Sequence, residues 1–281
     1  MGRRLVVCCD GTWNSIVGAA QARGVTNVAR LFLSVRPRAA DGAEQIATYV
    51  RGVGTGPLER LRGGAFGFGL SRRIGEAYRF LVENYRPGDE LWFFGFSRGA
   101  FTARSTAGFV RQCSILRRQE IGRLEEAYRM YRARGARYHP DAPEPVAFRR
   151  AHSHPPTRIR FIGVWDTVGS LGIPVSPWNP LALLNRPWSF HDTTLSSSVD
   201  HARHAVAADE RRGPFRPTLW VRSDRARPGT QTLHQAWFAG VHSDVGGGYE
   251  DPGLAQVALR WMMDAAGARA PCRALPGRGR G

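Results

Sequence analysis

Lysine is absent from the 281-residue sequence, so all 40 basic residues are arginines. With 23 acidic residues, they give a formal net charge of +17. Such an excess suits contact with phosphate groups of lipids or of nucleic acid. The arginines are spread along the chain and interrupted by acids, as in "RRQEIGRLEEAYRMYRARGARYH", which indicates a solvated helix face. We therefore expect no nucleic-acid partner, and we attribute the excess to genome composition or to peripheral contact with an anionic membrane.

Cysteine is scarce. The four cysteines are Cys8, Cys9, Cys113 and Cys272. No C-x-x-C spacing and no Cys/His cluster occurs, so the sequence predicts no metal site and no cofactor. Scattered thiols of this kind fit a reducing compartment.

Long apolar runs are also missing. The first apolar run ends at Asp10, which is too short for the core of a signal peptide. No run reaches the 18 apolar residues that a membrane-spanning helix needs. We expect a protein that is cytoplasmic as synthesised and would leave the cell only by a non-classical route.

Short apolar runs, in contrast, recur along the chain. They lie at 5–9, 45–50, 90–96, 159–165 and 236–241, and their lack of alternation predicts strands buried on both faces of a parallel sheet. One-sided apolar patterns at 26–35, 70–85 and 120–135 predict helices between them. The sequence thus predicts an α/β fold with a doubly wound, mainly parallel sheet.

Three boundaries follow from this pattern. Residues 1–266 are expected to form a single domain. Within it, 169–235 is expected to be an irregular insertion over the active edge, whose Pro- and Trp-rich part at 170–190 forms a lid, a lipid-facing surface or a piece of the core. The Gly-, Pro- and Arg-rich residues 267–281 are expected to be a disordered tail.

The stretch "GFSRG" directly follows the most apolar run and matches the G-x-S-x-G pattern. In that pattern a sharp strand-to-helix turn projects the serine over the edge of the sheet, and the two glycines leave room for the neighbouring strand and helix. Ser97 is therefore the candidate nucleophile. With 33 glycines in the chain, the alternative is a chance match.

A serine nucleophile needs a base and an acid, which in this fold follow it in the order acid, then histidine. His242 opens a glycine-rich loop after an apolar run and is the first choice as base, with His204 second although its surroundings look helical. Asp166 ends the run at 159–165 and is the first choice as acid. Asp209 and Asp224 are alternatives, and Asp244 stands too close to His242 in the chain to be favoured.

An oxyanion hole needs backbone N–H groups. The residue after the nucleophile, Arg98, supplies one candidate, and the loop "CCDGTWN" supplies Gly11 or Thr12 if the run at 5–9 lies beside the run at 90–95. Asp10 is expected to hold this loop by bonding to its own backbone. A phosphatase-like D-x-D-G-T reading fails because Cys8 stands in place of the first aspartate.

Several blocks occur together in order: "CCDGTWN", "TNVARL", "YVRGVGTG", "DELWFFGFSRGAFTAR", "VWDTVGS", "DERRGPFRPTLW" and "WFAGVHSDVGGGY". From about residue 3 to about residue 264 the chain resembles the uncharacterised α/β-hydrolase domain family that includes the type VI secretion phospholipase effectors. The resemblance implies an α/β-hydrolase fold and a Ser-Asp-His esterase, with Ser97 as nucleophile, His242 as base and Asp166 as acid. It also implies a phospholipid substrate and a secretion-system or immunity partner.

The sequence therefore predicts a serine hydrolase that cleaves carboxylic esters of lipids or phospholipids without a metal. Two alternatives stay open. One is a catalytically inactive α/β domain that binds anionic lipid or a protein partner. The other is an esterase for small soluble esters.

Overall fold

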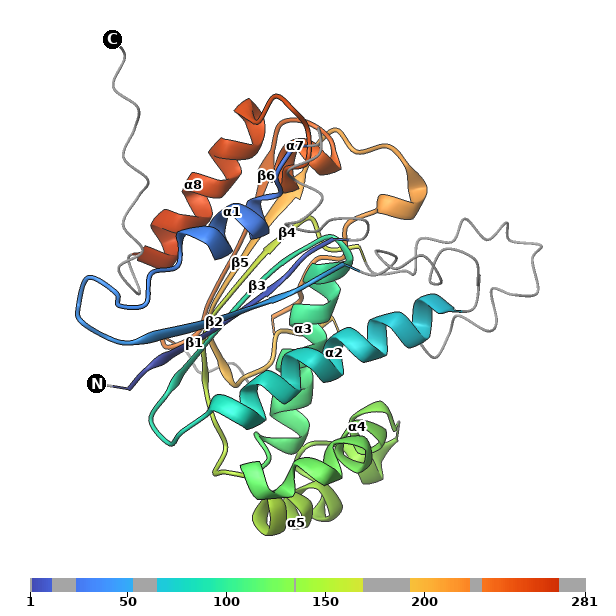
Figure 1. Ribbon diagram of the computed structural model, residues 1–281. Helices are drawn as coiled ribbons and strands as arrows, with labels where there is room; N and C mark the ends of the chain where they lie inside the picture. Colours follow the sequence, from blue (N-terminus) through green and yellow to red (C-terminus); the bar gives the residue numbers. More distant parts are fainter. Residues whose placement is uncertain are drawn as a thin grey trace, which may run out of the picture.

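A six-stranded, all-parallel sheet forms the centre of the computed structural model, with its strands in the order β2-β1-β3-β4-β5-β6 (Figure 1). The structure describes residues 2–11, 24–52, 65–133, 135–168, 193–222 and 229–267. The strands are β1 (Arg4–Cys9), β2 (Gln45–Val50), β3 (Glu90–Phe96), β4 (Ile159–Trp165), β5 (Val199–Ala207) and β6 (Thr232–Phe238). The predicted α/β class and doubly wound parallel sheet are confirmed.

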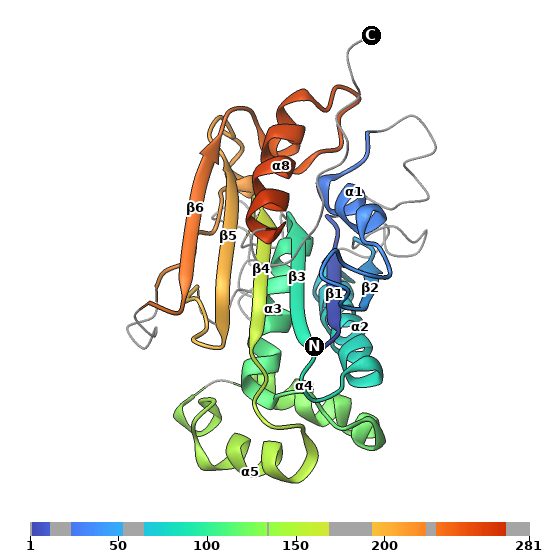
Figure 2. The ribbon, with the colours of Figure 1, turned by 90° about the vertical axis from the view of Figure 1, so that its left-hand side faces the viewer.

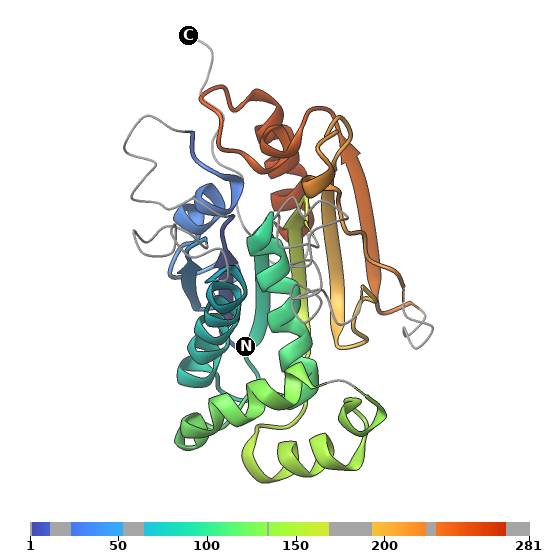
Figure 3. The same cartoon turned by 90° about the vertical axis from the view of Figure 1, so that its right-hand side faces the viewer.

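Helices cover both faces of the sheet. One face carries α1 (Asn27–Ser34), α7 (His242–Gly246) and α8 (Gly253–Gly267) (Figure 2). The other carries α2 (Ala65–Asn84) and α3 (Arg98–Cys113), with α4 (Leu124–Arg132) and α5 (Pro143–His152) beyond them (Figure 3). Short 3-10 turns form η2 (Arg118–Arg123), η3 (Ala136–Tyr138) and η5 (Gly213–Phe215).

The sheet separates two apolar clusters, one on each face. On the α2/α3 side, Tyr78 of α2 stacks on Phe109 of α3 with ring centroids 3.9 Å apart. Beneath α1 and α8, Trp92 stacks on Phe161 at 5.5 Å. Burying a side chain of this size contributes about 1.5–3 kcal/mol, so both faces anchor the strands whose ends carry the candidate site.

Two expectations about the later part of the chain are wrong. The segment 169–235 is not one irregular insertion, because it contains β5 and the start of β6, and β5 lies between β4 and β6 in the sheet. The surroundings of His204 are accordingly a strand and not a helix. The Pro- and Trp-rich part at 170–190 and the tail at 268–281 lie outside the described residues, so the lid and the disordered tail stay predictions.

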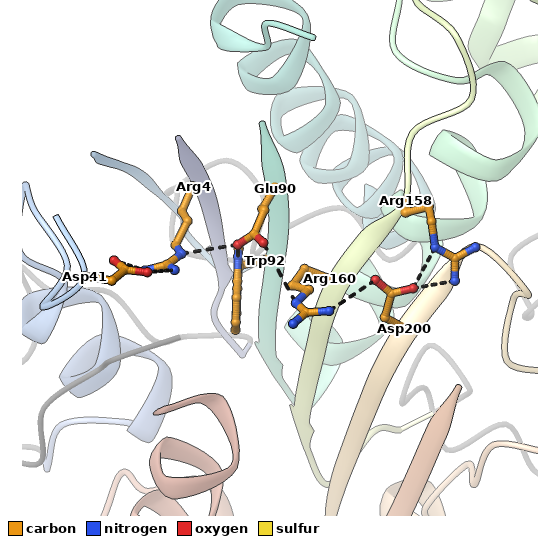
Figure 4. Close-up of polar contacts among 7 residues, drawn as sticks. All are labelled: Arg4, Asp41, Glu90, Trp92, Arg158, Arg160 and Asp200. Atoms are coloured by element: carbon orange, nitrogen blue, oxygen red, sulfur yellow. Dashed lines mark hydrogen bonds and ion pairs between the residues drawn. The ribbon is translucent and has the colours of Figure 1, made fainter. Parts of the chain in front are cut away.

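A row of charges of alternating sign crosses the amino ends of four strands (Figure 4). Arg4 of β1 pairs with Asp41 at 2.5 Å and with Glu90 of β3 at 3.2 Å. Arg160 of β4 reaches Glu90 at 3.9 Å and Asp200 of β5 at 3.8 Å. Partly exposed pairs add little stability each, but the row pairs several arginines with acids at the edge opposite to the candidate site.

The carboxyl ends of the strands meet at the other edge. There β3 runs into α3 through Ser97, β4 ends before Asp166, and β6 is followed by α7, which begins at His242. In a parallel sheet this is the edge at which ligands bind. Among the described helices, none combines the length and apolar character needed to cross a membrane.

Candidate active site

Ser97 occupies the turn between β3 and α3 in a strained conformation. Its backbone has φ 57° and ψ −121°, a left-handed region that costs a non-glycine residue about 1–3 kcal/mol. Its N–H donates to the Trp165 carbonyl at 3.1 Å, and its carbonyl accepts from the Phe101 N–H at 3.2 Å. The side chain makes no hydrogen bond that caps α3, so the helix start does not use the hydroxyl.

The two flanking glycines explain how the turn fits. A Cβ atom at Gly95 would lie 2.6 Å from the carbonyl oxygen of Gly99. A Cβ atom at Gly99 would lie 2.1 Å from the carbonyl oxygen of Cys9. Both distances are too short for any side chain, so the strand-turn-helix closes on itself and against the end of β1 only because these positions are glycines.

Asp166 and His242 are in direct contact. Oδ2 of Asp166 lies 2.6 Å from Nδ1 of His242, and the carboxylate is fully buried. The other oxygen, Oδ1, accepts the Ala207 N–H at 3.0 Å. Asp166 itself has φ 38°, so its carboxylate is presented from a second strained turn. A proton on Nδ1 would face the carboxylate, which leaves Nε2 as the nitrogen that can exchange a proton with a substrate or nucleophile.

Two aromatic rings enclose the imidazole of His242. Phe96, the residue before Ser97, has its ring centroid 4.6 Å from that of His242. Phe215 approaches from η5 at 4.8 Å with its ring edge-on. Gly246 of α7 lets the helix pass over Phe96, because a Cβ atom there would lie 1.9 Å from the phenyl ring. The histidine and the serine turn are thus packed together through Phe96.

Sequence reasoning missed a brace behind the histidine, formed by Glu210, Arg212 and Phe215. Oε2 of Glu210 accepts the His242 N–H at 3.3 Å and pairs with Arg212 at 2.6 Å. The guanidinium of Arg212 lies 4.1 Å from the Phe215 ring centroid. The hydrogen bond from Arg212 lowers the pKa of Glu210 to about 2, so the carboxylate is charged at neutral pH. The block "DERRGPF" was the only signal for these residues.

Backbone hydrogen bonds account for two of the other candidate acids. Oδ2 of Asp244 accepts the Val241 N–H at 2.9 Å and so caps α7. Oδ2 of Asp209 accepts the Gly240 N–H at 2.7 Å. Both hold the loop that presents His242, while neither is the carboxylate on its Nδ1. Asp224 lies outside the described residues.

The loop after β1 lies next to the serine turn, as the pairing of β1 with β3 requires. Asp10 is buried there and accepts hydrogen bonds from Thr26 Oγ1 at 2.6 Å and from the Tyr49 hydroxyl. It also accepts the Gly11 N–H at 2.6 Å. The expectation that Gly11 donates to an oxyanion is therefore wrong for this structure, because Asp10 already engages that N–H. Thr12 lies outside the described residues.

Arg98 and His204 remain to be placed. Arg98 is the first residue of α3, where a helix directs its N–H groups outward from its end. His204 is fully buried within β5 and contacts the backbone of Thr167 and the side chain of Gln235. Both of its ring nitrogens are engaged by these partners, and the Asp166 carboxylate contacts His242 instead. Within the described ranges, no group of three or more His, Cys, Asp or Glu residues could hold a metal ion.

Comparison with known proteins identifies relatives across most of the chain. Residues 3–265 match the family described as "T6SS, Phospholipase effector Tle1-like, catalytic domain". An uncharacterized protein of Saccharomyces cerevisiae is 29% identical over 236 residues, which are 76% of this chain and 32% of the yeast protein.

Two solved structures resemble the chain at lower identity. An uncharacterized protein from Pseudomonas aeruginosa is 19% identical with a TM-score of 0.56, over 98% of this chain and 48% of that one. The Tle1 effector bound to the VgrG spike of the type 6 secretion system is 21% identical with a TM-score of 0.46, over 90% of this chain and 52% of that one. The chain thus spans 32% of the yeast relative and about half of each solved chain. With residues 3–265 matched, it belongs to the family of Tle1-like type VI secretion phospholipase effector catalytic domains.

Proposed function

We propose that this domain is a serine hydrolase that cleaves acyl esters of phospholipids. The observation that carries the proposal is the 2.6 Å contact between Asp166 and His242 beside a strained serine turn. An acid, a histidine and a strained serine at one sheet edge are the parts of an acyl-transfer triad. Membership in a phospholipase effector family supports lipid esters as the substrate class.

The proposed reaction has two halves. Ser97 Oγ attacks the ester carbonyl carbon while His242 Nε2 takes its proton, and Asp166 stabilises the imidazolium that results. The tetrahedral intermediate then collapses, and the leaving alcohol takes the proton from His242. In the second half, water attacks the acyl-enzyme with His242 as base, and the carboxylic acid leaves from a regenerated Ser97.

The oxyanion is proposed to bind the N–H of Arg98 and an N–H of the loop after β1, with Thr12 as donor in place of Gly11. Arg98 adds a charge beside the nucleophile. Burial lowers the pKa of its guanidinium to about 10, which leaves it protonated at neutral pH. A cation at that place supports an anionic headgroup near the ester and peripheral contact with an anionic membrane.

Fluorophosphonate labelling tests the serine mechanism. We expect the probe to label the wild-type protein and not Ser97→Ala, because the probe traps an activated serine. Ser105→Ala is the matched control, since Ser105 is a buried serine within α3, the helix that directly follows Ser97. If folded wild-type protein is not labelled, the domain is instead an inactive one that binds lipid or a protein partner.

Substrate class needs a separate comparison. Release of fatty acid from vesicles of phosphatidylethanolamine and phosphatidylglycerol is measured beside turnover of p-nitrophenyl butyrate. The proposal predicts that vesicles are hydrolysed by wild type and spared by Ser97→Ala. Untouched vesicles together with rapid turnover of the soluble ester would assign the domain to small soluble esters instead.

The secretion context is also a proposal. The family description includes the type VI secretion system, which supports synthesis in the cytoplasm, export by a non-classical route, and a secretion-system or immunity partner. Co-purification of tagged protein with a spike protein, compared with a surface-charge variant, tests that partner. Retention of all the protein inside cells with an active secretion system would contradict the export.

A further inference from the structure

His204 is a histidine that the proposed reaction does not use. It nevertheless contacts the backbone of Thr167, the residue directly after Asp166. It is fully buried in β5, and its neighbours Arg104 of α3 and Trp220 place it on the α3 side of the sheet. Its Nε2 accepts the Thr167 N–H at 3.1 Å. Its Nδ1 lies 3.2 Å from Oε1 of Gln235 on the neighbouring strand β6.

These two contacts fix the tautomer of the ring. A backbone N–H can only donate, so Nε2 of His204 carries no proton and Nδ1 donates to Gln235. The amide of Gln235 is fixed in turn, because its Oε1 accepts the Trp220 N–H at 2.8 Å and its Nε2 donates to the Trp220 carbonyl at 3.0 Å. A flipped or protonated imidazole would lose the bond to Thr167.

The bond to Thr167 acts on the conformation of Asp166. The N–H of Thr167 and the carbonyl of Asp166 belong to one planar peptide unit, so holding that N–H restrains ψ of Asp166. The next carbonyl, that of Thr167, accepts the Thr218 N–H at 2.8 Å. Asp166 has φ 38°, a conformation that persists only where its surroundings enforce it.

The charge state of His204 agrees with this role. Burial, and then the nearby guanidinium of Arg104 from α3, lower the pKa of His204 to about 3. The ring is therefore neutral at neutral pH, which keeps Nε2 available as an acceptor. The buried ring of Trp220 packs edge-on against it, 5.7 Å between centroids.

We propose that His204 is a positioning residue, which as a neutral acceptor holds the Asp166–Thr167 peptide so that the Asp166 carboxylate meets Nδ1 of His242. Its effect on turnover rests on the proposed serine hydrolase mechanism. Its effect on the contact between Asp166 and His242 does not depend on any substrate.

Two amide substitutions separate this role from simple core packing. In His204→Gln the amide oxygen can stand where Nε2 stands and accept the Thr167 N–H. In His204→Asn the amide ends at the position of Nδ1 and cannot reach it. We expect kcat of His204→Asn to fall about 10- to 100-fold, the cost of a misplaced catalytic group, with KM unchanged within about twofold. For His204→Gln we expect a fall below about threefold.

A spectroscopic readout covers the case in which the wild-type protein has no esterase activity. The proton between His242 Nδ1 and Asp166 should give a far-downfield proton NMR signal that disappears in Asp166→Ala. The proposal predicts that His204→Gln keeps this signal and that His204→Asn loses or shifts it. Absent activity with this pattern intact would overturn the proposed function and support the positioning role.

Further outcomes decide the proposal. Equal kcat and an equal downfield signal in His204→Asn and wild type would overturn it. Equal losses in both folded amide variants would also overturn it, because packing alone would then explain the effect. If His204→Asn does not fold, Gln235→Leu tests the same hydrogen bonds from β6. This substitution removes the acceptor of the His204 Nδ1 proton, so the tautomer of His204 is no longer fixed. Unchanged kcat in Gln235→Leu would contradict the proposal.

Discussion

The buried neutral state of His204 makes the stability of the fold depend on pH in a defined direction. In the unfolded chain its imidazole has the ordinary pKa of 6.5, while in the folded protein the pKa is about 3. Between these values the unfolded state binds one more proton than the folded state. The free energy of unfolding must therefore rise with pH across this window and fall as the solution is acidified.

The size of the effect follows from the two pKa values. Each pH unit below 6.5 costs about 1.4 kcal/mol until the folded pKa is reached. Between pH 7 and pH 5 the contribution of His204 is therefore a loss of about 2 kcal/mol. For 281 residues, with an unfolding entropy of about 2.1 cal/mol/K per residue, this corresponds to a fall in Tm of about 3 °C.

Urea unfolding at pH 7 and pH 5 measures this change for wild type and for His204→Gln. The substitution changes stability at both pH values, but it removes the titration, so the loss between the two should be about 2 kcal/mol smaller in the variant. His139→Gln is the control, because His139 is half exposed. If wild type and His204→Gln lose the same stability between pH 7 and pH 5, the buried neutral imidazole is refuted.

Three other substitutions test separate parts of the site. Asp166→Asn should lower kcat about 10³- to 10⁴-fold by favouring the wrong tautomer of His242, measured by ester turnover, and a loss below tenfold would remove Asp166 from its proposed role. Gly99→Ala places a Cβ atom 2.1 Å from a carbonyl oxygen of β1 and should cost about 1–3 kcal/mol in urea unfolding. Its control is Gly75→Ala in α2, with nothing within 4 Å, and equal effects would contradict the close approach. Glu210→Gln should reduce the free energy of unfolding above pH 4.5. The difference in unfolding free energy between wild type and variant should shrink as acid titrates the wild-type carboxylate toward its pKa of about 2. A difference that does not change with pH would refute the charged brace.

The sequence indicates the edge of the sheet at which the candidate residues meet. Ser97 and Asp166 each follow an apolar run, and the carboxyl ends of parallel strands share one edge. The glycines around Ser97 also predict the sharp turn that the structure contains. These features are local in the chain, so a pattern of a few residues is enough to reveal them.

The sequence around His242 does not show which aspartate contacts its imidazole. Asp209 and Asp244 precede or follow the histidine loop much as a triad acid could, and both are instead bound to backbone N–H groups. The order β4-β5-β6 in the sheet brings Asp166, which follows β4, to the imidazole, which follows β6. The position of Asp166 at the end of an apolar run makes it the first choice, but that position does not by itself separate it from the other acids.

Strand β5 was missed for a related reason. Its sequence "VDHARHAVA" carries Asp200, His201, Arg203 and His204, so it lacks the apolar run that marks the other strands. The polar side chains find partners that the sequence does not display: Asp200 joins the charge row, His201 bonds to Thr232, and His204 bonds to Thr167. Contacts with residues far away in the sequence therefore stabilise β5 as a strand.

Asn27 at the start of α1 donates to the carbonyls of Val245 and Ala255, both at 2.9 Å, and Thr26 bridges to Gly247. The segment that bears His242 is thus fastened to α1, an element that is synthesised long before it. At about 5–20 residues per second, a nascent chain carries Ser97 for roughly 7 to 30 seconds before its histidine exists. A lipid-cleaving activity of the proposed kind would consequently be withheld from the producing cell's own membranes until α7 has been synthesised, and would begin only when α7 docks on α1.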